Sequence, residues 1–310
     1  MIAFVFPGQG SQYVGMGRDL YESFAESKRI FDAVDRVLKF PLSKLCFEGP
    51  TEELTRTVNC QPAIFTVSLA ALAAFNKKLS ATSFQLSAKY VAGLSLGEYT
   101  ALVAARALSL PDGISLVVNR ARFMDEAASI NPGRMSCILG LDLNTIKNIA
   151  EESGAHIANL NCPGQVVISG TTDAVDKANS LALARGAKRV VNLDVSGAFH
   201  SSLMQPASLR LAKILKNIKM KEPTAALVSN VTATPVLNPV QIKENLVRQL
   251  TASVYWEQSV RFMIGQGVNK FFEIGPGKVL RGLIRKIDTN AQVVNIGGVE
   301  DINKFAKAGE

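Results

Sequence analysis

The sequence predicts an α/β fold, with a mostly parallel sheet covered by helices and a smaller domain inserted into it. Apolar runs that read as short strands alternate with segments of helical periodicity along most of the 310 residues. Between Gly133 and Val195 this alternation gives way to a different order of strands and helices. A chain of this length with 47% hydrophobic residues can bury a full core and hold more than one domain. We therefore predict a large domain formed by residues 1–128 and 196–310, and a small domain at 129–195.

The large domain contains five predicted strands, each a short apolar run bounded by turn residues. They are Met1–Phe6, Tyr90–Gly93, Ala226–Ser229, Lys270–Ile274 and Gln292–Ile296. Its predicted helices are Phe65–Phe75, Gly97–Ala107, Pro111–Ala128 and Ser202–Lys216. The longest apolar stretch, Ala63–Phe75, is interrupted by Thr66 and Ser68 and is shorter than the roughly 20 residues that span a bilayer. We therefore expect a core helix there and no association with a membrane.

The predicted small domain has the order βαββαβ. Its strands and helices are expected, in order, at Met135–Gly140, Asn144–Ser153, His156–Leu160, Gln165–Ser169, Ala174–Arg185 and Arg189–Asp194. This order is that of a ferredoxin-like unit, in which two helices pack on one face of an antiparallel sheet.

Composition limits the possible functions. The four cysteines have no CxxC spacing, and His156 and His200 are the only histidines, so we expect free thiols, no metal site and a cytoplasmic location. A net charge of +8 favours an acidic partner. Because no dense Lys/Arg run is interleaved with aromatic residues, we do not expect that partner to be nucleic acid.

The clearest chemical signal is Gly93-Leu94-Ser95-Leu96-Gly97, a G-x-S-x-G between a short strand and a helix. This is the nucleophile elbow of hydrolase-like α/β cores, in which small residues permit a tight turn that exposes the serine hydroxyl. We predict Ser95 as a nucleophile with the Leu96 N–H directed at the developing oxyanion. The alternative is a serine that only caps the helix.

A nucleophilic serine usually needs a base, and only the two histidines come into question. His156 begins an apolar strand and is expected to be a surface or edge residue. His200 follows Gly197-Ala198-Phe199 in a loop between a strand and a helix, where α/β folds place catalytic groups, so we predict His200 as the base. The alternative is a histidine that caps the following helix. No acid is evident to orient the ring: Asp194 is near in sequence, and a backbone carbonyl could do the same.

Seven segments together resemble the malonyl-CoA:acyl carrier protein transacylases of type II fatty acid synthesis, in the family's order and over essentially the whole chain. They are Phe6–Gln12, Gly93–Tyr99, Asn119–Met124, Gly197–Ser201, Ser229–Thr232, Leu246–Leu250 and Glu273–Gly277. Seven segments in order are far more specific than any one of them.

The resemblance implies a Ser95–His200 dyad, with the main-chain carbonyl of Gln249 orienting the histidine. It also implies an oxyanion hole made by the main-chain N–H groups of Gln9 and Leu96. Glycines on both sides of Gln9 fit this role, because a main-chain N–H reaches a substrate only where side chains do not crowd it. Without the resemblance, the Gly8–Gly10 segment would be interpreted as a plain turn.

Arg120 would bind the free carboxylate that distinguishes malonyl from acetyl, because a guanidinium matches a carboxylate bidentately. It follows the apolar run Leu116–Val118, and a buried arginine needs an anionic partner. Asp125 or Glu126 could instead be that partner. Phe199 resembles the bulky residue that excludes an α-methyl group in related polyketide acyltransferases, which favours malonyl over methylmalonyl.

The implied reaction is a ping-pong transfer from malonyl-CoA to the phosphopantetheine thiol of an acyl carrier protein, with no metal or redox cofactor, by a monomer. Leu94 departs from the family, where a histidine often precedes the nucleophile, and this could alter rate or acyl preference. Two basic groups could dock an acidic carrier: Lys278, Arg281, Arg285 and Lys286, or Lys216, Lys219 and Lys221. Either could equally be a solvated face.

Two other functions share some of these residues. A serine thioesterase or other hydrolase would use Ser95 and His200 but would have no need of an arginine at the acyl end. A non-catalytic domain that binds carrier proteins would tolerate Ser95→Ala.

Overall fold

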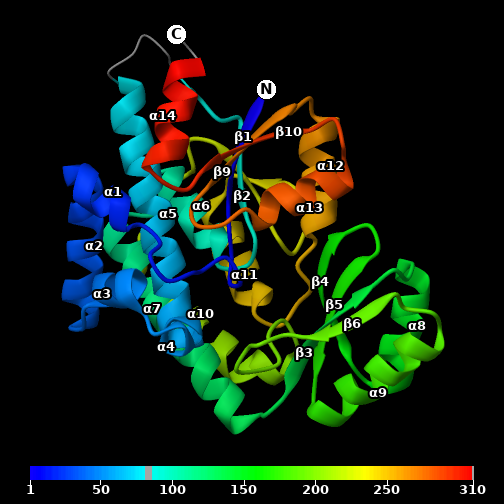
Figure 1. Ribbon diagram of the computed structural model, residues 1–310. Helices are drawn as coiled ribbons and strands as arrows, with labels where there is room; N and C mark the ends of the chain where they lie inside the picture. Colours follow the sequence, from blue (N-terminus) through cyan, green and yellow to red (C-terminus); the bar gives the residue numbers. More distant parts are fainter. Residues whose placement is uncertain (81–85, 309–310) are drawn as a thin grey trace.

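A computed structural model describes residues 1–80 and 86–308, and its strands form two separate sheets (Figure 1). Sheet A has six strands in the order β10-β9-β1-β2-β7-β8, and sheet B has four in the order β4-β5-β3-β6. Sheet A is mostly parallel and sheet B is antiparallel. The predicted fold class, a mostly parallel core with an inserted ferredoxin-like unit, is confirmed.

Sheet A is buried on both faces. Its strands are β1 (Ile2–Phe6), β2 (Tyr90–Gly93), β7 (Ala226–Val228), β8 (Pro235–Val236), β9 (Lys270–Ile274) and β10 (Gln292–Ile296). Side chains alternate along a strand, so Ala3 and Val5 of β1 pack with the cluster that includes Trp256 and Leu283, while Phe4 and Phe6 join the larger cluster on the other face. Helices on both faces explain why these strands are mainly apolar.

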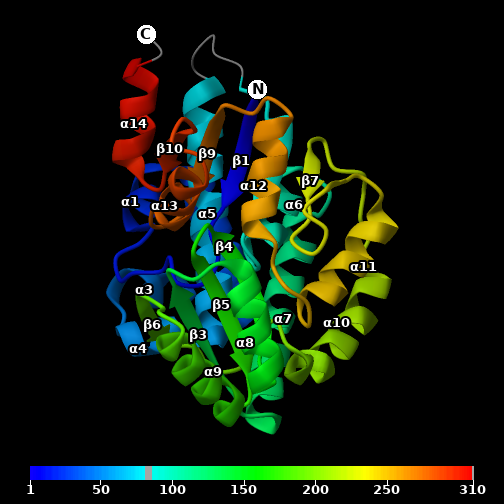
Figure 2. The same ribbon diagram turned by 90° about the vertical axis from the view of Figure 1, so that its right-hand side faces the viewer.

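Helices cover sheet A unequally. The side of the larger cluster carries α5 (Thr57–Ser80), α6 (Gly97–Ala104), α7 (Leu110–Ile130), α10 (Gln205–Asn217) and α11 (Pro239–Gln249). The opposite face is covered by α12 (Trp256–Gly265) and α13 (Val279–Ile287) (Figure 2). The last described helix is α14 (Val299–Ala308).

Helix α5 is longer than the sequence analysis predicted. It spans 24 residues with Pro62 inside it, and by length and apolar composition it is the one helix in the described part of the chain that could cross a membrane. However, 78% of its most apolar window is buried inside the protein, where it packs against α2 and α7. The environment of α5 is therefore that of a core helix, as expected.

Sheet B and two helices make up the small unit. Its strands are β3 (Arg134–Leu139), β4 (His156–Cys162), β5 (Gln165–Gly170) and β6 (Arg189–Asn192), and its helices are α8 (Leu143–Ser153) and α9 (Thr172–Ala184). Ile138 and Ile168 pack on these helices, whereas Met135 and Val167 face the large unit. The division of the chain at residues 129 and 195 stays a prediction.

The first third of the chain contains helices that the sequence analysis did not assign. They are α1 (Arg18–Ser23), α2 (Ala25–Leu38), α3 (Leu42–Glu48) and α4 (Thr51–Thr55). Helices α1, α3 and α4 have five to seven residues, so they are marginal by themselves and depend on tertiary packing, which local periodicity does not show. This reason does not apply to α2, which has 14 residues. The predicted helix at Ser202–Lys216 instead begins with a 3₁₀ turn, Ser202–Met204, before α10. The two-residue edge strand β8 was also not predicted.

The strand ends place the site. β1, β2 and β7 run parallel, so the loops that follow them, which carry Gln9, Ser95 and Asn230, leave the same edge of sheet A. Sheet B lies beyond this edge (Figure 1). Main-chain hydrogen bonds from Val254 to Ala158 and from Leu160 to Val254 join β4 to the segment before α12.

Candidate active site

Ser95 occupies a strained turn between β2 and α6. Its φ of 50° lies in the left-handed region, which is unusual for a residue with a side chain. The turn is packed so closely that a Cβ on Gly97 would lie 2.1 Å from the Phe6 carbonyl oxygen, and one on Gly8 would lie 2.3 Å from the Leu94 carbonyl oxygen. Only glycine fits at these two positions. The structure thus has the elbow geometry that G-x-S-x-G predicts.

Ser95 does not cap helix α6. The N-cap is Leu96, and no side chain caps this helix. The Ser95 hydroxyl instead lies 2.9 Å from His200 Nε2 and 2.9 Å from Arg120 Nη2. The capping interpretation is therefore wrong.

His200 is oriented by a main-chain carbonyl. Its Nδ1 lies 2.7 Å from the Gln249 carbonyl oxygen, which can only accept, so Nδ1 carries the proton and Nε2 is free to accept from Ser95. Asp194 lines the same cavity but is exposed and is not the ring's partner. The alternative role of His200 as a helix cap is wrong, because Ser201 caps the following turn.

The neutral form of His200 is strongly favoured. Burial lowers the pKa of this histidine to about 4, and the positive charge of Arg120 adds to the effect. An unprotonated imidazole nitrogen beside a serine hydroxyl can accept the hydroxyl proton at neutral pH, as a general base requires. By contrast His156 is exposed, with its Nε2 3.2 Å from Ser202 Oγ, as expected for an edge residue.

Arg120 is a fully buried guanidinium, with 1% of its surface exposed. Nη1 donates to Gln61 Oε1 at 2.6 Å, and Nη2 donates to Gln249 Oε1 at 3.0 Å and to Ser95 Oγ at 2.9 Å. Its Nε is buried and has no hydrogen-bond partner. The partners of this cation are therefore neutral, and its hydrogen-bonding capacity is incompletely used.

The carboxylates that could have neutralised Arg120 from its own helix do not contact it. Glu126 pairs with Arg210 and with Arg122, and no ion pair to Arg120 occurs among residues 1–80 and 86–308. The alternative that Asp125 or Glu126 pairs with Arg120 is wrong. Glu98 is the acidic group whose charge is felt at Arg120, and Gln249 stands between them, bonded to both.

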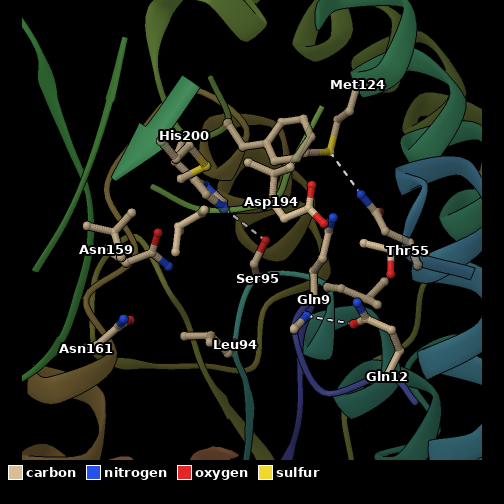
Figure 3. A pocket seen from close by; sticks show the side chains of 18 of the residues that line it. Gln9, Gln12, Thr55, Leu94, Ser95, Met124, Asn159, Asn161, Asp194 and His200 are labelled. Atoms are coloured by element: carbon tan, nitrogen blue, oxygen red, sulfur yellow. Dashed lines mark hydrogen bonds between the residues drawn. The ribbon is translucent and has the colours of Figure 1, made fainter. Parts of the chain in front are cut away.

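The cavity at the site has a volume of about 460 Å³ and lies between the edge of sheet A and sheet B. Figure 3 shows Ser95 facing His200, with Gln9 and Gln12 to one side and Asn159 and Asn161 to the other. The remaining lining residues include Leu94, Leu96, Arg120, Met124, Met135, Val167 and Phe199. One end of the cavity is therefore a cation and the walls are largely apolar.

The main-chain N–H groups of Gln9 and Leu96 lie at this cavity and are among those with no acceptor within the described residues. The Ser95 N–H is already used, because it donates to Asn230 Oδ1 at 2.7 Å. The turn at Gln9 and Gly10 thus lines the cavity, which a plain surface turn would not do. Both free N–H groups are suited to an oxyanion.

Sequence reasoning did not identify Gln61, Glu98, Asn159 and Asn161 as site residues, and it quoted Asn230 only within a segment of family resemblance. Gln61 binds Arg120, Glu98 and Asn230 lie beneath the elbow, and the other two line the cavity. Apart from Asn159 and Asn161, which share strand β4, they are separated by dozens of residues in sequence, so no local pattern connects them. Asn159 and Asn161 were the most accessible signal, since asparagines within an apolar strand are unusual.

No cluster of three or more His, Cys, Asp or Glu side chains that could hold a metal occurs in the part of the chain that the structure describes. All four cysteines are buried free thiols: Cys46, Cys60, Cys137 and Cys162.

Comparisons with known proteins agree on one family. Residues 3–305 match the model of the acyl transferase domain. The chain is 45% identical to the malonyl CoA-acyl carrier protein transacylase of Bacillus subtilis over 97% of this chain and 95% of that protein. It is 41% identical to the transacylase of the same name from Escherichia coli K12, over 92% of each chain.

Solved structures give the same result. The acyl-carrier-protein-S-malonyltransferase of Bartonella henselae superposes with a TM-score of 0.94 at 40% identity, covering 99% of this chain and 98% of that one. A malonyl-transacylase in complex with its type II PKS acyl-carrier protein also superposes with a TM-score of 0.94, at 36% identity and 99% coverage of both chains.

Proposed function

We propose that this chain, which belongs to the acyl transferase domain family, transfers malonyl from malonyl-CoA to the phosphopantetheine thiol of an acyl carrier protein. The product would supply fatty acid synthesis. The transfer passes through a malonyl ester on Ser95, so the reaction is a ping-pong exchange.

The observation that carries the malonyl assignment is the position of Arg120. A buried cation without an ionic partner is costly, and an anion at the end of the substrate would compensate it. Arg120 Nη2 is within 2.9 Å of the nucleophilic oxygen, so a carboxylate bound there would lie close to the acyl carbon that Ser95 attacks. Malonyl carries such a carboxylate and acetyl does not.

The first half-reaction begins with malonyl-CoA in the cavity, its carboxylate on Arg120. Ser95 Oγ attacks the thioester carbon as its proton passes to His200 Nε2. The N–H groups of Gln9 and Leu96 hold the oxyanion of the tetrahedral intermediate. The C–S bond then breaks, and the sulfur of coenzyme A leaves with the proton from His200.

The second half-reaction uses the same groups in reverse. The phosphopantetheine thiol gives its proton to His200 Nε2 and attacks the ester carbon. The C–O bond to Ser95 breaks, and Ser95 Oγ recovers the proton. Every step is a proton transfer or an acyl transfer between groups already named, so the proposed reaction needs no metal or redox cofactor.

Phe199 would select for malonyl within this cavity. Its buried ring lies next to His200 and lines the wall, where a bulky side chain leaves less room for an α-methyl branch. Leu94 lines the same cavity and contributes an apolar surface.

The carrier docks, in this proposal, on the basic group of α13. The turn before α13 packs on the loop that lines the cavity, since a Cβ on Gly277 would lie 3.1 Å from the Ser11 carbonyl oxygen. Lys286 Nζ reaches across to Gln165 of the small unit at 3.3 Å. The other basic group lies by the α6–α7 connection, where the Lys221 N–H donates to Ala107. The α13 group thus contacts both the loop that lines the cavity and the small unit.

The protein is proposed to act as a cytoplasmic monomer. Four buried free thiols are consistent with a reducing compartment. The partners named here are malonyl-CoA and the carrier protein, with no role for nucleic acid or a membrane.

Intact-protein mass spectrometry tests the function. Wild type exposed briefly to malonyl-CoA should gain one malonyl group, Ser95→Ala should gain none, and added phosphopantetheinylated carrier should remove the group from wild type. A hydrolase would lose the group to water faster than to the carrier. A non-catalytic binding domain would remain unmodified, and either result would refute the proposal.

A further inference from the structure

Glu98 is a buried carboxylate directly behind the nucleophile, in the first turn of α6, and no step of the transfer uses it. We propose that Glu98 is a positioning residue that fixes the nucleophile, the base and the arginine in one geometry, acting through the amides of Asn230 and Gln249. The inference rests on the proposed function and adds a residue to its site.

Asn230 is the first of the two connections. Its main-chain N–H donates to Glu98 Oε1 at 2.8 Å, and its side-chain Nδ2 donates to the Gly93 carbonyl at 2.7 Å. With the amide so fixed, Asn230 Oδ1 accepts the N–H of Ser95 at 2.7 Å. Glu98 thus helps to hold the nucleophile's backbone in its left-handed conformation, which is strained by itself.

Gln249 is the second connection, and its side chain contacts three functional groups. Nε2 donates to Glu98 Oε2 and to the Ser95 carbonyl, the latter at 2.9 Å. Because both N–H bonds of the amide are directed in this way, Oε1 is turned toward Arg120 and accepts from it at 3.0 Å. The main-chain carbonyl of the same residue accepts from His200 at 2.7 Å.

The chemistry of a carboxylate explains why glutamate suits this position. An ionised carboxylate only accepts hydrogen bonds, so it dictates that both neighbouring amides present N–H groups to it. Glutamine has the same length but would direct its own NH₂ at one of these donors. Either that donor or the glutamine would then lack a partner in a fully buried site, which is expensive.

Charge supports the same role. Burial raises the pKa of Glu98 to about 7, while the Asn230 and Gln249 donors and the charge of Arg120 act in the opposite direction. Above about pH 7, where Glu98 is mostly ionised, Arg120 and Glu98 form a buried pair of opposite sign with Gln249 between them. Removing the carboxylate disturbs the acceptor that orients Arg120.

A purely structural role is the competing explanation, and the chain offers a matched control. Glu273 is also fully buried, and it accepts the main-chain N–H groups of Leu280 and Arg281 at 2.9 and 2.8 Å and the side chain of Asn295 at 2.8 Å. It organises the start of α13 and contacts none of the reacting groups. Both carboxylates stabilise the fold, but only Glu98 connects to the dyad.

The experiment compares Glu98→Gln with Glu273→Gln and wild type. Quenched single-turnover mass spectrometry with malonyl-CoA gives three quantities: the final fraction of acylated chain, the rate constant at saturation and the half-saturation concentration. Thermal unfolding of the same samples reports stability. Where Glu98→Gln does not accumulate as folded protein, Glu98→Asp, which retracts the carboxylate by one methylene, replaces it.

The expected result is that both glutamine variants unfold at lower temperature than wild type. Glu98→Gln, or its aspartate replacement, still reaches about one malonyl per chain but does so about 10- to 100-fold more slowly at saturation, from one buried polar group left unpaired. Glu273→Gln keeps the rate constant within about twofold. A merely structural residue would not produce a lower rate constant together with an unchanged final fraction of acylated chain.

Two outcomes overturn the inference. One is a Glu98 variant whose folded fraction acylates at the wild-type rate. The other is an equal loss of rate in Glu273→Gln. Absence of malonyl on wild type itself refutes the proposed function instead, so the two failures are distinguishable.

Discussion

At the scale of the residue, two neighbouring buried groups at the site differ in charge. Arg120 is a cation held among neutral partners, and His200 is a base kept neutral beside it. Burial keeps the imidazole neutral, and the charge of the arginine further disfavours a second positive charge on the ring. A bound carboxylate would relieve both, since it compensates the guanidinium and reduces its effect on the ring.

Replacing Arg120 should therefore affect substrates with and without a carboxylate differently. Arg120→Gln is expected to lower kcat/KM for malonyl-CoA about 10- to 150-fold, from the loss of charge-assisted hydrogen bonds worth about 1.5–3 kcal/mol. Acetyl-CoA provides the control and should lose much less. Steady-state kinetics with both thioesters measure the ratio, and a proportional loss for both would count against a role in carboxylate binding.

The pH dependence follows from the lowered pKa of His200. The base must be unprotonated in the free enzyme, so its own titration should lower kcat/KM around a midpoint of about 4, as a step separate from the one that protonation of Glu98 produces around pH 7. In Arg120→Gln a neighbouring positive charge is gone, the imidazolium is less disfavoured and the lower midpoint should move to higher pH. Single-turnover acylation across this range checks both, and the absence of the low-pH step in both proteins would contradict the assignment.

At the scale of the element, the elbow depends on contact between backbones. β1, β2 and the start of α6 approach so closely that Gly8 and Gly97 have no space for a side chain. This packing brings the loop with Gln9 next to Ser95, so the N–H groups of Gln9 and Leu96 both lie at the cavity. The proposed oxyanion hole would therefore be a property of two neighbouring strand ends and not of one motif.

Gly97→Ala should destabilise the protein and impair acylation together. The added Cβ would meet the Phe6 carbonyl at 2.1 Å, so the backbone must move, at a cost of about 1–3 kcal/mol. Gly282→Ala is the matched control, because this exposed glycine lies in helix α13 with nothing within 4 Å of its would-be Cβ. Denaturant titration should show Gly282→Ala at or above wild-type stability, by up to about 1 kcal/mol. Equal stabilities for the two variants would refute the steric account.

At the scale of the whole molecule, one cavity lies between the edge of sheet A and sheet B. Sheet B turns Met135 and Val167 toward the site while its other face packs on its own helices. The α13 group lies where the two units meet, and Lys286 contacts Gln165 of the small unit. A carrier bound there could deliver its phosphopantetheine arm between them.

Charge reversal on α13 should weaken carrier recognition specifically. Lys278→Glu with Arg285→Glu is expected to raise the KM for the carrier about tenfold or more at low salt, with the difference shrinking as salt is added. Acylation by malonyl-CoA in the absence of carrier should change much less. Lys216→Glu with Lys219→Glu is the control, because these exposed residues lie near the α6–α7 connection. A larger effect in this control than in α13 would show that the wrong group was chosen.

The sequence by itself determined the fold class and the two central residues of the site. Alternating apolar and helical periodicity is local, so it identified the strands of both sheets except the two-residue β8, and the elbow is a strand–turn–helix signal within a few residues of Ser95. His200 followed because the chain has only one other histidine to consider. The roles of Arg120, Gln9, Gln249 and Phe199 came from family resemblance and not from any local pattern.

Only the tertiary structure decided the surroundings of these residues. Glu98 meets Asn230 across 132 residues and Gln249 across 151, and Arg120 meets Gln61 across 59. Such pairings are set by how the strand ends converge, and no periodicity along the chain records them. The same holds for the lack of an ion pair to Arg120 among the described residues: two acids follow it within six residues, but the helix directs Glu126 to Arg122 and Arg210.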